Sequence, residues 1–175
     1  MSYLDQQFAY AKAQGWLPAF AQAAKDYDLP EALLMAIASR ETNMRNIVGD
    51  GGHGYGLMQI DIRSFPEWVS SGAWHYAAQV IEKGAQVLDQ KLTQIRAGVG
   101  KSLHIGGTSF IGHPFSSQED ELRCATAAYN AGLWPFYCHS TGKPIDSMTT
   151  GHNYSTDVWQ RRALFEALLR DSPNG

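Results

Sequence analysis

Apolar residues recur at helical spacing at the start of the chain. Leu4, Phe8 and Ala11 fall on one face of a helix, and a second amphipathic stretch runs over about residues 18–27. Apolar positions three or four residues apart share one side of a helix, so each stretch has a face to bury. The pattern predicts two short amphipathic helices before residue 28.

A third helix is predicted from its start signal. We expect Asp28 to cap the free N–H groups, Pro30 to occupy the first turn and Glu31 to complete a capping box, with the helix running to about Asn43. One stripe of this helix carries Leu34, Ile37, Ala38 and Glu41. The pattern therefore places one carboxylate on the core-facing side.

Three further helices are predicted downstream. One starts after Trp74 and stops at Gly98, one is capped by Ser117 and reaches Gly132, and the last spans about residues 154–170. The first of the three is the longest, with small or apolar residues at Ala77, Val80, Ile81, Gly84, Leu88, Leu92 and Ile95. We expect it to be the central, largely buried helix.

Two glycine-rich segments interrupt the helices. Residues 48–56 contain five glycines, which predicts a shaped loop or a short hairpin rather than a helix. Residues 98–118 are rich in Gly, Ser, Thr and Pro, which predicts an irregular insertion. Residues 1–175 are therefore expected to form one domain that contains this insertion.

Composition and charge narrow the class of partner. The 175 residues are 44% hydrophobic and 11% aromatic, enough for the sizeable core of one domain. The net charge of −3 makes nucleic acid an unexpected partner, because phosphate binding needs clustered basic residues. No apolar run approaches the roughly 20 residues of a membrane span, and the opening MSYLDQQF lacks the basic start of a signal peptide. We expect no membrane span and no export signal in this chain.

Metal and thiol chemistry are not indicated. The six histidines show no paired ligand spacing on a predicted helix, and no metal or other cofactor is expected. Cys124 and Cys138 do not form a CxxC pair. They are either free thiols or one bridge, and the missing export signal favours free thiols.

Three carboxylates carry the candidate chemistry. Glu41 lies in the last turn of its predicted helix, where the negative end of the helix dipole and burial both raise a carboxyl pKa toward the range of a general acid. A buried structural carboxylate is the alternative. Asp50 and Asp61 flank the glycine loop. An inverting glycosidase pairs a protonated acid with an ionised carboxylate that holds water, and a loop folded over the helix end could supply the latter.

Three blocks of sequence resemble the goose-type lysozymes, relatives of the lytic transglycosylases. They cover about residues 31–65 and 123–165 and occur in the order of that family. The first block is Ser39-Arg40-Glu41, Gly49-Asp50 and Gly54-Tyr55-Gly56-Leu57-Met58-Gln59-Ile60-Asp61; the second is Ala127-Ala128-Tyr129-Asn130-Ala131-Gly132; the third is Tyr154-Ser155-Thr156-Asp157-Val158.

The resemblance implies a predominantly helical α+β fold of the lysozyme type, with a small glycine-rich loop or hairpin beside the catalytic helix. It implies cleavage of the β-1,4 bond between N-acetylmuramic acid and N-acetylglucosamine in peptidoglycan. Glu41 matches the general acid of the family, and Asp50 and Asp61 match the aspartates that position water. Residues that line the cleft are matched by Gln59, Tyr129, Asn130 and Tyr154. One departure is Phe65, where the family often has histidine, and it affects one subsite contact.

The aspartates also bear on the type of reaction. Lytic transglycosylases share much of this pattern but usually lack acids at the positions of Asp50 and Asp61, because the 6-hydroxyl of the sugar replaces water. Hydrolysis with inversion is therefore favoured. The alternatives are a transglycosylase that yields 1,6-anhydromuramic products and a peptidoglycan-binding module without chemistry.

The resemblance also implies the partners and the place of action. The expected partners are peptidoglycan glycan strands and, for some members of such families, a proteinaceous lysozyme inhibitor. We expect a soluble monomer that acts on the cell wall, outside the cell or in the periplasm. Its setting could be phage lysis, an injected effector or defence.

Overall fold

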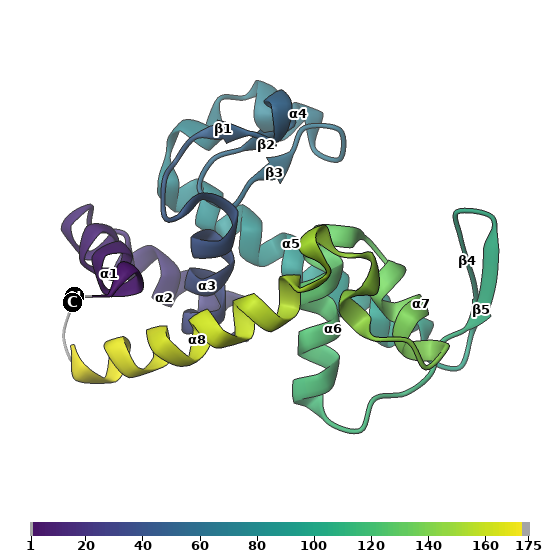
Figure 1. Cartoon of the computed structure of the whole chain (residues 1–175). Coiled ribbons are helices and arrows are strands. Elements are labelled where there is room, and N and C mark those ends of the chain that lie inside the picture. Colours follow the sequence, from purple (N-terminus) through teal and green to yellow (C-terminus); the bar gives the residue numbers. More distant parts are fainter. Residues whose placement is uncertain (1, 173–175) are drawn as a thin grey trace. The chain divides into compact units, whose positions relative to one another are not determined.

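The computed structural model describes residues 2–172 and divides the chain into two compact units. Unit 1 comprises Met1–Gln86 and Val158–Gly175, and unit 2 comprises Val87–Asp157. The boundaries fall inside two helices, α5 (Ala77–Gly98) and α8 (Tyr154–Asp171). Figure 1 labels the elements along the chain. Each unit is described by itself below.

Unit 1 combines helices with a small antiparallel sheet. The sheet has the order β1-β2-β3, and Val48 pairs with Tyr55 while Tyr55 pairs with Ile60. Besides the start of α5 and the end of α8, the elements of the unit are α1 (Tyr3–Ala13), α2 (Leu17–Asp26), α3 (Glu31–Thr42), β1 (Val48–Gly49), β2 (Gly54–Tyr55), β3 (Ile60–Asp61) and α4 (Pro66–Ser70). The glycine-rich segment is thus a short hairpin, as the sequence predicts.

Unit 2 consists of helices and a separate two-stranded hairpin. Besides the end of α5 and the start of α8, its elements are β4 (Ser102–Ile105), β5 (Thr108–Ile111), α6 (Gln118–Ala131) and α7 (Trp134–Ser140). Helix α6 packs on α7, which in turn packs on the 3-10 turn Ile145–Met148. The fold is predominantly helical with small antiparallel sheets, which confirms the predicted α+β class.

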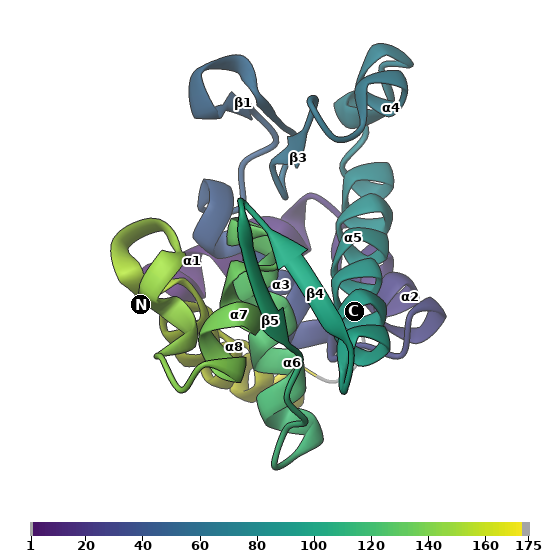
Figure 2. The same ribbon diagram turned by 90° about the vertical axis from the view of Figure 1, so that its right-hand side faces the viewer.

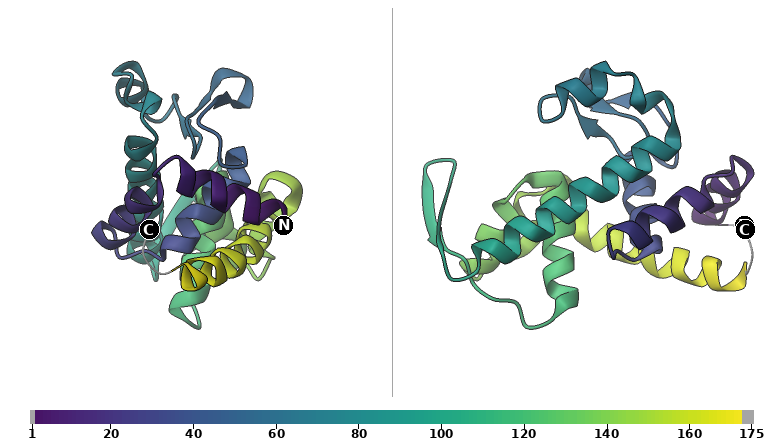
Figure 3. Two further views of the ribbon diagram at one scale, coloured as in Figure 1. Left: turned by 90° about the vertical axis from the view of Figure 1, so that its left-hand side faces the viewer. Right: turned by 180° about the vertical axis from the view of Figure 1, so that it is seen from behind.

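Helix α3 lies in the core of unit 1 and packs on α2 (Figure 3). Its residues from Ala32 to Ser39 are all buried, and Leu33, Leu34, Met35 and Ile37 are fully buried. The prediction of a single apolar stripe was too narrow, because this helix is covered on every side. Glu41 is half-buried near its C-terminal end.

The predicted cap of α3 was wrong. The helix begins at Glu31 with Pro30 at the N-cap, and no side chain caps it. Asp28 instead ends α2: it has a left-handed φ of 51°, and the next N–H, from Leu29, donates to Ala24 O at 2.9 Å. This is the hydrogen bond of a Schellman motif, so Asp28 serves the preceding helix rather than the following one.

Residues 98–118 are also more ordered than the sequence predicts. Strands β4 and β5 pair in register from Ser102–Ile111 to Ile105–Thr108, and Figure 2 shows them side by side. The turn is Gly106-Gly107, with φ values of 52° and 81°. Two glycines with positive φ between pairing strands form the tight turn whose twist suits a hairpin. Two of the five glycines in this segment therefore form the turn of a hairpin.

The bounds of the other predicted helices are confirmed within one or two residues, but α5 has one buried and one exposed face and is not largely buried as predicted. Ser117 caps α6 by accepting a hydrogen bond from Asp120 N at 3.1 Å. Both cysteines are buried free thiols, and burial raises the pKa of Cys124 to about 12. No helix within residues 2–172 is both long and apolar enough to cross a membrane.

Candidate active site

Glu41 is held in the last turn of α3 by the way this helix ends. Asn43 and Met44 both have left-handed backbones, with φ of 55° and 59°, which turn the chain sharply toward the sheet. The hydroxyl of Thr42 donates to Leu57 O at 2.8 Å and accepts from Arg45 N at 3.1 Å. These bonds fix the end of α3, and with it the backbone of Glu41, against the segment between β2 and β3.

A second tie comes from Asn46, a residue that the sequence analysis missed. Its Oδ1 accepts from Leu57 N at 2.8 Å, and its Nδ2 donates to Trp74 O at 3.0 Å. Asn46 thus joins the chain after α3 to the sheet and to the segment before α5. Its isolated position in the sequence gives no spacing from which this role could be predicted.

Gln59 supports the hairpin from inside. Its Nε2 donates to Ile47 O at 3.1 Å and to Gly56 O at 2.9 Å, so both of its N–H groups are used. A Cβ atom at Gly49 or Gly54 would lie 2.3 Å from the Oε1 of Gln59, so a side chain at either position would force Gln59 to move. Two of the five glycines in this segment are therefore explained by the close approach of Gln59.

Asp50 and Asp61 are brought together by Arg63. The Nε of Arg63 donates to Asp61 Oδ1 at 2.9 Å, and its Nη2 lies 3.5 Å from Asp50 Oδ2. The backbone N–H of Arg63 also donates to Asp61 Oδ1 at 2.9 Å. One guanidinium therefore links the two predicted aspartates across the hairpin.

Arg63 also lowers the pKa of Asp61. Partial burial acts to raise the pKa of Asp61, but the hydrogen bonds from Arg63 and its positive charge outweigh this, so the pKa of Asp61 is lowered. Asp61 is therefore ionised at neutral pH. The sequence analysis gave Arg63 no role, although an arginine two residues after an aspartate can bond back to it as it does here.

The other predicted site residues lie in unit 2. Tyr129 and Asn130 are half-buried at the end of α6, and Tyr154 is buried at the start of α8. Asn130 accepts from Thr150 N at 2.8 Å and donates to Thr150 Oγ1 at 3.2 Å. Asn130 thereby anchors the loop that leads into α8.

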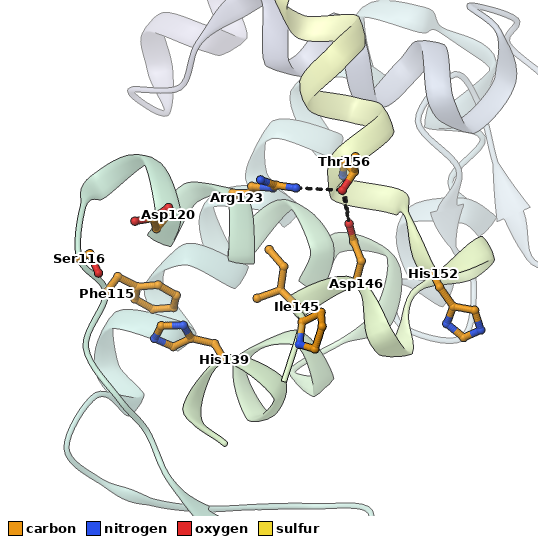
Figure 4. A pocket seen from close by; sticks show the side chains of 10 residues that line it. Phe115, Ser116, Asp120, Arg123, His139, Ile145, Asp146, His152 and Thr156 are labelled. Atoms are coloured by element: carbon orange, nitrogen blue, oxygen red, sulfur yellow. Dashed lines mark hydrogen bonds between the residues drawn. The ribbon is translucent and has the colours of Figure 1, made fainter. Parts of the chain in front are cut away.

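Asp146 fixes the start of α8, as Figure 4 shows together with the pocket beside it. Its Oδ1 accepts from Ser155 N at 2.8 Å, and its Oδ2 accepts from Thr156 N at 3.1 Å. The hydroxyls of Ser155 and Thr156 each donate to Oδ2 at 2.9 Å. Burial acts to raise the pKa of Asp146, but these hydrogen bonds outweigh it and lower the pKa.

The role of Asp146 could not be predicted because this residue lies far in sequence from the helix that it caps. It lies eight residues before α8, whereas an ordinary cap directly precedes its helix. Arg123 completes the arrangement by donating from Nη2 to Thr156 Oγ1 at 2.8 Å. The adjoining pocket has a volume of about 490 Å³ and is also lined by Phe115, His139 and Ile145.

Comparison with known proteins places the chain in a family. The family model described as "Lysozyme g" matches residues 10–167. The chain belongs to the lysozyme g family. It is 28% identical over 155 residues to lysozyme g of Takifugu rubripes, an alignment covering 85% of this chain and 72% of that protein. It is 27% identical to lysozyme g of Cyprinus carpio and 29% identical to that of Epinephelus coioides, over 90% and 80% of this chain and 76% and 69% of those proteins.

Membership of the lysozyme g family confirms the resemblance seen in the three sequence blocks. The chain is a glycoside hydrolase of the lysozyme type, with a lysozyme-like fold and peptidoglycan as its substrate. The match covers both Glu41 and the hairpin with Asp50 and Asp61, as well as the AYNAG segment of α6. It begins at residue 10 and so leaves out most of α1.

Proposed function

We propose that this lysozyme is an inverting N-acetylmuramidase that cleaves the β-1,4 bond between N-acetylmuramic acid and N-acetylglucosamine. Glu41 donates a proton to the leaving oxygen, and Asp50 and Asp61 hold the attacking water. Inversion requires one acid that is protonated and another carboxylate that is ionised. The observation that carries the proposal is that one guanidinium, that of Arg63, holds Asp61 and Asp50 on the same side of the hairpin, at 2.9 and 3.5 Å.

The arrangement around Asp61 leaves room for a water molecule to bind. Oδ1 of Asp61 accepts from the backbone N–H and the Nε of Arg63, while Oδ2 has a single long contact within residues 2–172, 3.5 Å from the Ser64 hydroxyl. The carboxylate of Asp50 is exposed and lies 3.5 Å from Arg63 Nη2. A water bound between Oδ2 of Asp61 and Asp50 would give up a proton to an ionised carboxylate as it attacks the sugar.

The remaining predicted site residues fall into two groups: those that contact the glycan and those that support the surrounding structure. Tyr129 and Asn130 are half-buried, and we assign them to contact with the glycan. Tyr154 is buried, and Gln59 spends its N–H groups on the hairpin backbone. We therefore propose that Gln59 supports the hairpin of unit 1 and Tyr154 the start of α8 in unit 2, and that neither carries the main sugar contacts. The place of action that follows is the bacterial cell wall.

Variants of the carboxylates test the proposal. Glu41→Gln should reduce lysis by about 10²- to 10⁴-fold, since an amide cannot protonate the leaving oxygen. Asp50→Asn and Asp61→Asn should each reduce it less, and the double variant should approach the loss of Glu41→Gln, because groups that act as a unit are not additive. The control is Glu67→Gln, which neutralises an exposed carboxylate in α4.

The assay is clearance of a cell-wall suspension followed by mass spectrometry of the fragments. Reducing-end sugars support hydrolysis, whereas 1,6-anhydro sugars would mean transglycosylation. Binding of walls without fragments would mean a module that lacks chemistry. Strong lysis by a folded Glu41→Gln variant would refute the role of Glu41.

A further inference from the structure

A pocket of about 460 Å³ lies in unit 1 away from the three carboxylates discussed above. One wall comes from helix α1 and the other from the chain that follows α3. It is lined by Tyr3, Gln6, Gln7, Tyr10, Asn43 and Arg45. Three of these residues precede residue 10, where the match to the lysozyme g family begins. The pocket is therefore built in part from residues outside the family match.

Two tyrosines expose their rings at this pocket. Tyr3 is 57% exposed and Tyr10 is 46% exposed. They are seven residues apart on α1, so they share one face of the helix and stand about 10 Å apart along it. The ring of Tyr10 is held edge-on against Trp16 with centroids 5.5 Å apart. Exposed aromatic rings grouped on one face indicate a binding surface.

Two polar side chains of the pocket, Arg45 and Gln7, have N–H groups that donate to no acceptor within residues 2–172. Arg45 donates from Nε to Thr42 O at 3.1 Å, which leaves its two terminal nitrogens available. Gln7 is only 5% exposed, and its Oε1 accepts from the Ser39 hydroxyl at 2.6 Å. Its Nε2 meets no acceptor among residues 2–172. A buried donor without a partner is costly, so a ligand or water that supplies an acceptor here is favoured.

The position of Ser39 explains why Gln7 is fixed in this orientation. Its hydroxyl donates to Gln7 and accepts from Arg161 Nη1 at 2.7 Å. Because Ser39 has its single proton committed to Oε1, the amide nitrogen of Gln7 must face the other way. Ser39 stands two residues before Glu41, so the pocket and the proposed general acid are supported by the same helix end.

We propose that this pocket is an outlying subsite that binds an N-acetylmuramic acid residue of the glycan strand, remote from the bond that is cut. The apolar face of the sugar stacks on Tyr3 or Tyr10, the acetamido carbonyl accepts from a glutamine amide, and Arg45 pairs with the lactyl carboxylate. Arg45 follows Glu41 by four residues, so their Cα atoms lie within about 15 Å. In this proposal one strand occupies both places. This inference rests on the proposed function.

The test compares the binding of long and short glycans. The probes are peptide-free strands of alternating N-acetylglucosamine and N-acetylmuramic acid, a tetrasaccharide and an octasaccharide. Affinity is measured by titration calorimetry with the Glu41→Gln protein, which preserves the ligand. Adding Tyr3→Ala should weaken octasaccharide binding about threefold to tenfold and leave tetrasaccharide binding unchanged. Tyr3→Phe should retain the affinity, because it keeps the ring.

Two further arms identify the ligand chemistry. Arg45→Gln should weaken binding of the octasaccharide but not of an octamer of N-acetylglucosamine, which lacks the carboxylate. The matched control is Tyr76→Ala, which removes a tyrosine that is 65% exposed elsewhere in unit 1 and should change nothing. Thermal melts confirm that each variant is folded.

Different results would refute the proposed subsite and the proposed reaction. Equal octasaccharide affinity with and without Tyr3→Ala, in folded protein, overturns the subsite. Equal weakening of both octamers by Arg45→Gln overturns the assignment to N-acetylmuramic acid. Lysis by Glu41→Gln overturns the role of Glu41 instead. In that case the affinity for the N-acetylglucosamine octamer is compared with and without Tyr3→Ala before hydrolysis sets in, and this comparison still decides whether Tyr3 binds sugar.

Discussion

Replacing Asp146 should uncouple the start of α8 from the rest of unit 2. The first N–H groups of this helix all have partners: Tyr154 N donates to Thr149 Oγ1 at 3.2 Å, and Ser155 N and Thr156 N donate to the two oxygens of Asp146. Asp146 is 7% exposed, so its hydrogen bonds to the helix are largely shielded from water. Asp146→Ala therefore leaves two helix N–H groups without an acceptor.

The expected magnitudes follow from these contacts. Loss of an N-cap side chain costs up to about 2 kcal/mol, and buried groups left unsatisfied add about 1–3 kcal/mol. We expect Asp146→Ala to lower the free energy of unfolding by about 3–5 kcal/mol. Asp146→Asn should cost less, about 1.5–3 kcal/mol, because its single oxygen can serve only one of the two N–H groups. Anchoring of Tyr154 should weaken in parallel, and lysis with it.

The assay is urea unfolding followed by circular dichroism, from pH 7 to pH 3. The lowered pKa of Asp146 means that its contribution is fully present above the ordinary carboxyl pKa of 3.8 and is lost as pH falls through the lower pKa of the folded state. The gap between the protein and Asp146→Asn should therefore be constant from about pH 7 to 5 and shrink below about pH 4.

Asp171→Asn is the control for Asp146, since it neutralises an exposed carboxylate at the opposite end of α8. It should change stability by less than about 0.5 kcal/mol. A cost for Asp146→Ala no greater than that of the control would refute the capping role. A gap between the protein and Asp146→Asn that widens toward low pH would refute the linkage argument.

Two other predictions concern the charge of Asp61 and the buried thiols. Arg63→Gln removes the side-chain hydrogen bond and the positive charge that lower the pKa of Asp61, so the acidic limb of the pH–activity profile should move to higher pH. The control Arg96→Gln, which breaks the ion pair with Glu121, should leave the limb in place. An unmoved limb in Arg63→Gln would contradict the role of Asp61. Cys124 has a pKa of about 12 and both cysteines are buried, so a thiol reagent at pH 8 should find two reactive sulfhydryls in unreduced unfolded protein and almost none in the native state; a bridge would show as no sulfhydryl after unfolding.

The helices could be predicted from the sequence because the signals that define them span only a few residues. The spacing of Leu4, Phe8 and Ala11 marks α1, and Ser117 marks the start of α6, since apolar periodicity and caps act over a few residues. The same locality explains the error at Asp28. A cap residue between two helices can serve either one, and the hydrogen bond from Leu29 to Ala24 decides in favour of the earlier helix.

Family resemblance singled out Glu41, Asp50 and Asp61 as site residues, and their roles stay a prediction. In unit 1 the structure adds Arg63 and Asn46, which hold the hairpin and the chain after α3, and in unit 2 it adds Asp146, which holds the start of α8. Asn46 bonds across 11 and 28 residues, and Asp146 across nine and ten. Contacts at such separations depend on the path of the chain between them, and no pattern of spacing records that path.

The stereochemistry of the first product tests the central claim most directly. If Asp50 and Asp61 hold a water opposite Glu41, the reaction is a single displacement without a covalent glycosyl-enzyme. Proton NMR of the newly formed reducing end, recorded before mutarotation, should then show the α-anomer first. Appearance of the β-anomer first would mean retention of configuration and would contradict the water-holding role of the two aspartates.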